Sequence, residues 1–133
     1  MEGVIDTNVL VYALVENSAF HEECLRKLEG LRKIHLPLTV LEELVLVLKK
    51  LKVEEALIKK QIKEIVSDPR VFLANLEKKD VESVISILEK EKLSVKRFND
   101  KLILMTAKRM GLPLYTFDHE LRKECKKLKV KIL

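Results

Sequence analysis

Four acidic residues stand at the borders of apolar segments, where a carboxylate is seldom found without a partner. Asp6 and Asp118 each directly follow a short apolar segment. Glu43 interrupts one strongly apolar helical pattern, and Asp100 opens another. If the fold brings these side chains together, mutual repulsion and lost hydration make the cluster costly. A divalent cation relieves both penalties, and a set of oxygen ligands favours Mg²⁺ or Mn²⁺.

Each acid also has a local explanation as a helix cap. Asp6 and Asp118 are suitable N-caps for the segments that follow them, and Asp100 suits the first turn of a helix. Thr39 and Glu42 have the spacing of a capping box, which gives Glu42 a structural role and leaves Glu43 for the site. The choice between the two adjacent glutamates stays open at this stage.

Other catalytic chemistries have little support in the sequence. The histidines lack the paired spacing of a zinc site, and the glycines are too far apart for a phosphate-binding loop. The residues concerned are His21, His35, His119, Gly3, Gly30 and Gly111. There is also no Gly-x-Ser-x-Gly motif, so a serine nucleophile is not expected.

Short apolar segments alternate with amphipathic helical patterns along the chain. Strands are predicted at 3–6, 33–37, 70–76, 112–117 and 130–133. Helices are predicted at 18–31, 39–51, 54–68, 81–93 (capped by Asp80), 99–111 and 118–128, with 7–15 helical or turn-like. This alternation predicts a parallel sheet covered on both faces, with ligands bound beyond the carboxyl ends of its strands. Asp6 and Asp118 both lie at such ends.

Size and charge suggest one domain with a polyanionic partner. The chain has 133 residues and a net charge of +5. Residues 1–68 carry 10 basic and 12 acidic side chains (net −2), and residues 69–133 carry 16 and 9 (net +7). A basic half favours nucleic acid as a partner, although a solvated lysine-rich surface explains the charge equally well.

The cellular compartment is predicted from the lack of a membrane span and of a signal peptide in the sequence. No apolar run approaches the roughly 20 residues of a membrane span, and the first strand begins too close to Met1 for a signal peptide. Cys24 and Cys125 lack ligand spacing and are expected to be reduced thiols. We therefore expect a cytoplasmic protein.

Three stretches together resemble the PIN-domain family of nucleases. They are VIDTNVL at 4–10, LTVLEEL at 38–44 and FNDKLILMTAKRMGLPLYTFD at 98–118, followed by HEL. The compact size is similar to VapC-type toxins, ribonucleases held inactive by a VapB-type antitoxin. The resemblance implies one nuclease domain over 1–133, a three-layer α/β/α fold with a five-stranded parallel sheet, and an acidic pocket for Mg²⁺ or Mn²⁺.

The resemblance also assigns roles to particular residues. It implies that Asp6, Glu43, Asp100 and Asp118 are the catalytic, metal-binding acids and that Thr7, Asn8 and Thr116 support them. Single-stranded RNA is the implied substrate, although six scattered Tyr and Phe residues suggest no base-stacking platform. One departure from the family pattern is Lys101, where a small or apolar residue is usual. Lys101 is either a phosphate contact or part of the rim.

Further expectations concern partners. Candidate phosphate contacts are Lys96, Arg97, Lys101, Lys108 and Arg109. The apolar patterns at 41–51 and 54–66 suggest more apolar surface than one small domain hides, which predicts a homodimer, with an antitoxin bound nearby. Two alternatives remain: an RNA-processing nuclease outside a toxin system, and a non-catalytic module that binds RNA or protein.

Overall fold

The computed structural model describes residues 1–133, built around a four-stranded parallel sheet. The strands are β1 (Glu2–Ile5), β2 (Lys33–Pro37), β3 (Val71–Ala74) and β4 (Leu114–Tyr115), in the order β3-β2-β1-β4. The predicted fifth strand is wrong. Of residues 130–133, only Ile132 forms a bridge, pairing with Leu114 on the free side of β4.

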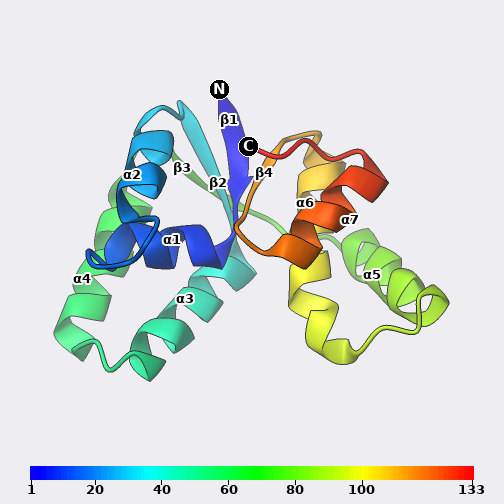
Figure 1. The fold of residues 1–133 in the computed structure, drawn as a ribbon, viewed down its shortest axis with the longest axis horizontal. Helices are drawn as coiled ribbons and strands as arrows, with labels where there is room; N and C mark the ends of the chain where they lie inside the picture. The colour runs from blue at the N-terminus through cyan, green and yellow to red at the C-terminus, as the bar shows by residue number, and fades with distance from the viewer.

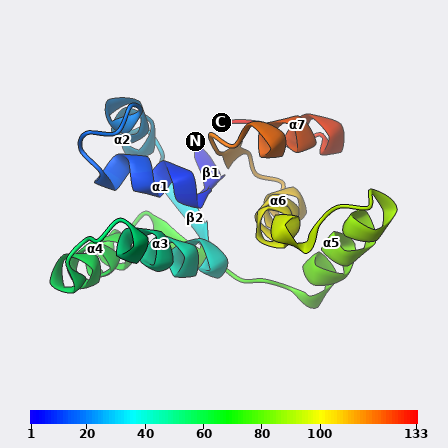
Figure 2. The same ribbon diagram turned by 60° about the horizontal axis from the view of Figure 1, so that its bottom comes forward.

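Helices cover the sheet on both faces, which confirms the α/β class. One group comprises α1 (Thr7–Leu14), α2 (His21–Glu29), α3 (Leu38–Lys50) and α4 (Glu55–Ser67). The other comprises α5 (Lys78–Lys90), α6 (Phe98–Met110) and α7 (His119–Leu128), with the 3₁₀ turn η1 (Val95–Arg97) leading into α6. Figures 1 and 2 show the two groups on opposite sides of the strands.

Apolar strands and helix stripes form the core that fixes these layers. Val4 and Ile5 of β1 are fully buried, as expected for a strand covered on both faces. Ile103 and Leu104 of α6 are also fully buried. The near-continuous apolar character of α6 therefore reflects its position between the sheet and the outer helices, and it fixes the place of Asp100 in its first turn.

Helix ends differ from the sequence expectations in two places. Helix α5 begins at Lys78, so Asp80 lies inside its first turn and accepts a hydrogen bond from the Glu77 N–H at 3.0 Å. Helix α3 begins at Leu38, and the Thr39 hydroxyl is buried without a hydrogen-bond partner, so the predicted capping box is absent. At the end of α6 the prediction is correct, because Gly111 has a left-handed φ of 65°.

Neither cysteine forms a disulfide, and both are buried. None of the helices combines the length and apolar character needed to cross a membrane.

Candidate active site

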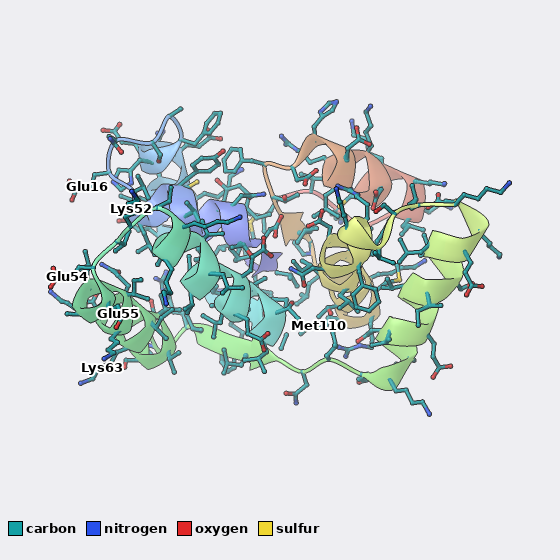
Figure 3. The ribbon with its side chains drawn as sticks, turned by 90° about the horizontal axis from the view of Figure 1, so that it is seen from below. Glu16, Lys52, Glu54, Glu55, Lys63 and Met110 are labelled. Atoms are coloured by element: carbon teal, nitrogen blue, oxygen red, sulfur yellow. The ribbon has the colours of Figure 1, made fainter.

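A pocket of about 230 Å³ opens where the carboxyl ends of β1 and β4 meet α3 and the start of α6. Figure 3 views the molecule from below, toward this edge of the sheet, and its labelled Lys52, Glu54 and Glu55 lie at the outer α3–α4 turn. The pocket wall includes all four predicted acids together with Thr7 and Asn8. Three apolar or aromatic side chains complete it: Val11, Tyr12 and Val47.

Asp6 is the most deeply buried of the four pocket acids and is held by a network across the sheet. Its Oδ1 accepts from the Thr7 N–H at 2.7 Å, and its Oδ2 accepts from Thr116 Oγ1 at 2.6 Å and Asn8 Nδ2 at 3.1 Å. Asn8 Oδ1 also accepts from the Phe117 N–H at 3.1 Å. Asn8 and Thr116 therefore join the end of β1 to the loop after β4 and fix Asp6 between them.

Glu43, not its neighbour Glu42, lies in the pocket. Glu42 is exposed and does not line it. Glu43 Oε2 accepts a hydrogen bond from Asn99 Nδ2 at 2.5 Å, which ties α3 to the first turn of α6. Sequence reasoning did not identify Asn99, although its position directly before Asp100 was a usable signal.

Asp118 and Asp100 share a basic neighbour. Asp118 caps α7 through Oδ1, which accepts from the Leu121 N–H at 3.0 Å, so the predicted cap is present. Its Oδ2 lies 3.9 Å from Arg97 Nη1, and Asp100 Oδ2 lies 3.1 Å from the same nitrogen. Arg97 thus places one positive charge beside two of the four acids.

Burial and crowding raise the carboxyl pKa values of three of these acids. The pKa of Asp100 rises to about 6, first because burial disfavours its charge and then because Asp6 and Asp118 repel it, with Arg97 opposing. Burial is also the main cause of the raised pKa of Asp6, to which repulsion by Glu43 and Asp118 adds. The pKa of Glu43 is likewise raised mainly by burial, and repulsion by Asp100 adds to it. Such perturbed carboxyls gathered in one pocket are typical of a functional site.

The donor set suits a hard divalent cation, although the side chains are not arranged around one. Four carboxylates face the pocket, and the buried Thr7 lies in its wall. No three His, Cys, Asp or Glu side chains converge closely enough to surround one ion. Oxygen donors and crowded negative charge fit Mg²⁺ or Mn²⁺ in type, and the guanidinium of Arg97 stands between two of the donors.

The five candidate phosphate contacts prove to be of different kinds. Lys96 and Lys108 are exposed, and Arg97 lies by the pocket. Lys101 is neither a phosphate contact nor part of the rim, because it is only 2% exposed and its Nζ lies 2.6 Å from Glu124 Oε2. Arg109 is bound to the buried Asp80 at 3.0 Å and to the Asn75 carbonyl at 2.7 Å, so it links α6 to α5.

Aromatic side chains distant in the sequence gather beside the pocket, contrary to the sequence expectation. The Phe20 ring stacks on Phe117 with centroids 4.7 Å apart, and Tyr12 packs edge-on against both at 5.3 Å. Ser18 Oγ donates to the Tyr12 carbonyl at 2.9 Å, which holds the α1–α2 loop in this position. Phe20 is 40% exposed, and Tyr12 also lines the acidic pocket.

Comparison with known proteins identifies the family. A sequence model of the PIN domain matches residues 3–127. Comparison with curated proteins finds no match. Among solved structures, VapC20 of Mycobacterium tuberculosis, described as a sarcin-ricin loop cleaving toxin, is 15% identical with a TM-score of 0.79, covering 93% of this chain and 95% of its own.

Two further solved structures are similar as well. VapBC2 from Rickettsia felis, bound to a promoter DNA fragment, is 24% identical with a TM-score of 0.71 and covers 100% of this chain and 97% of its own. FitAcB from Neisseria gonorrhoeae is 18% identical with a TM-score of 0.69, with coverages of 100% and 96%. At these identities the likeness establishes the fold, and the match over residues 3–127 establishes that the chain belongs to the PIN-domain family.

Proposed function

We propose that this chain is a ribonuclease that requires a divalent metal, Mg²⁺ or Mn²⁺, and hydrolyses RNA phosphodiester bonds, acting as the toxin of a toxin–antitoxin pair. The observation that carries the proposal is the pocket itself: Asp6, Glu43, Asp100 and Asp118 line one pocket in a chain of the PIN-domain family. The similar structures named above, which include a toxin described as cleaving the sarcin-ricin loop, support the toxin assignment.

The roles of the acids follow from their positions. Asp6, Asp100 and Asp118 are the proposed ligands, and Glu43, held by Asn99, binds a second ion or orients the attacking water. A bound divalent cation would polarise a phosphoryl oxygen, lower the pKa of water and stabilise the leaving oxyanion. Asn8 and Thr116 keep Asp6 in place, so their contribution is positional.

The proposal is tested by incubating the purified protein with single-stranded RNA and Mg²⁺ or Mn²⁺. We expect cleavage by the wild type, loss of cleavage with EDTA and loss in Asp6→Asn. The matched control is Glu42→Gln, which changes the exposed neighbour of Glu43 and should cleave normally. Cleavage that persists in Asp6→Asn, or is absent with every RNA and metal tried, would contradict the assignment.

The aromatic cluster supports single-stranded RNA as the substrate, because unstacked bases bind aromatic faces. Replacing Tyr12 and Phe20 together by Leu removes two rings beside the pocket while keeping apolar bulk. We expect KM for single-stranded RNA to rise about 10-fold or more, since one stacked base contributes ~1–3 kcal/mol, with kcat little changed. Phe72→Leu, an exposed aromatic on β3, is the control, and an unchanged KM in the double variant would remove the stacking role.

A homodimer and an antitoxin are the proposed protein partners. Exposed apolar side chains on α3, α4 and the turn between them support an association surface: Leu46, Leu51, Leu57 and Val66 are 44–64% exposed. Exposed apolar patches mark protein interaction sites. The VapBC2 structure among the similar structures supports the antitoxin.

A further inference from the structure

One nitrogen of Arg97 stands between the free oxygens of two acids. Asp118 uses Oδ1 to cap α7, so Oδ2 is the oxygen that remains for another partner. That Oδ2 and Asp100 Oδ2 both face Arg97 Nη1, at 3.9 and 3.1 Å. The remaining oxygen of Asp118 and one of the two oxygens of Asp100 therefore already have a cationic neighbour.

On the side away from Asp100 and Asp118, a chain of ion pairs fixes the position of Arg97. Its other terminal nitrogen, Nη2, donates to Glu124 Oε1 at 3.0 Å. Glu124 Oε2 in turn lies 2.6 Å from the ammonium of Lys101, which is almost fully buried. The guanidinium is thus held by α6 and α7 together, and its place beside the acids is part of the fold.

Lys101 completes this arrangement. It follows Asp100 directly, and its charge is directed away from the pocket toward Glu124 and Glu91. Moving a carboxylate away from a buried cationic partner leaves an uncompensated charge, which is costly. Glu124 is therefore a positioning residue, since its hydrogen-bond contact with the site is through Arg97.

We propose that Arg97 is the resident counter-cation of the acidic pocket and that it competes with a divalent cation for Asp100 and Asp118. This inference rests on the proposed function, since it assumes that these carboxylates bind metal. Two cations cannot share the same oxygens without mutual repulsion, which acts strongly over 3–4 Å in a partly buried site. Arg97 lowers the repulsion among the acids when metal is absent, and it lowers metal affinity for the same reason.

The test is titration of Mn²⁺ alone into the purified protein, followed by calorimetry without RNA. Arg97→Gln removes the competing charge and should bind Mn²⁺ at least about 10-fold more tightly than the wild type. Arg97→Lys keeps the charge and should lie between the two. The control is Arg122→Gln, an equal change of net charge at an exposed arginine on α7 that makes no ion pair, and it should bind as the wild type does. Equal or weaker binding by Arg97→Gln overturns the proposal.

A measurement on the wild type covers the case in which Arg97→Gln does not fold. The Arg97 side-chain N–H resonance, assigned with Arg97→Lys, should shift as Mg²⁺ is added, because the guanidinium loses its carboxylate partners. An unmoved resonance at saturating Mg²⁺ overturns the competition. Neither readout involves RNA. Tight Mn²⁺ binding with no RNA cleavage would therefore refute the proposed function and leave this inference standing. Failure of both the wild type and Arg97→Gln to bind Mn²⁺ would refute the inference itself.

Discussion

Asp100→Asn is expected to lower RNA cleavage by at least about 100-fold and, in the same protein, to raise the thermal stability of the metal-free state. The loss of activity follows from removing a proposed ligand. The gain in stability follows from burial and from the repulsion by Asp6 and Asp118, which raise the Asp100 pKa to about 6 and make its ionised form unfavourable in the fold. An uncharged amide of nearly the same shape avoids that cost.

The stability gain should depend on pH with a definite sign. The Asp100 pKa is higher in the folded protein than its ordinary value of 3.8, so between about pH 4 and pH 6 the folded state holds the proton that the unfolded state has released. Stability of the wild type therefore falls as pH rises through this window. The difference between variant and wild type should grow from near zero at pH 4 to about 3 kcal/mol at pH 7.

Urea denaturation of both metal-free proteins from pH 4 to pH 7 measures this difference. Glu82→Gln, at an exposed carboxylate of α5 without an ion pair, is the control and should show no comparable trend. A difference that is constant with pH would mean that the Asp100 carboxyl is not strained in the fold. Added Mn²⁺ should reverse the order of stability, because only the wild type keeps the full set of carboxylates.

The position of the acidic pocket was predictable because a parallel sheet limits where strand ends can meet. Val4 and Ile5 form a buried apolar strand directly before Asp6, and β4 lies beside β1 in the sheet, so Asp6 and the segment before Asp118 had to share one edge. Glu43 and Asp100 lie in helices that pack against that edge. Periodicity and one topological rule indicated a shared edge for Asp6 and Asp118, and the resemblance to the PIN-domain family added Glu43 and Asp100.

The side chains around the acids were not predictable in the same way, because their partners come from distant segments. Lys101 is buried by contact with Glu124 and Glu91, which local helical pattern does not connect to it. Tyr12, Phe20 and Phe117 form one cluster only after α1, its following loop and β4 are assembled. The predicted strand at 130–133 is absent because this segment forms a single bridge with β4, between Ile132 and Leu114, and no continuous ladder.

Glu124→Ala is expected to destabilise the protein by about 3 kcal/mol, and more than Lys101→Met does. The two losses of stability differ because the two substitutions leave different charges without a partner. Without Glu124, the buried Lys101 ammonium keeps only Glu91, at 3.6 Å, and Arg97 loses its 3.0 Å partner. Without Lys101, Glu124 still accepts from Arg97, and the methionine refills an almost fully buried space with apolar atoms.

A double-mutant cycle in urea separates this pair from ordinary packing. The loss of unfolding free energy in the double variant Lys101→Met/Glu124→Met should be clearly smaller than the losses in Lys101→Met and Glu124→Met added together, because the double variant leaves neither of these two charges unpaired. Lys127→Met, at an exposed lysine that also contacts Glu91, is the matched control and should leave stability unchanged. Strictly additive losses would show that Lys101 and Glu124 act independently, and would also weaken the case for Glu124 as the group that holds Arg97 beside Asp100 and Asp118.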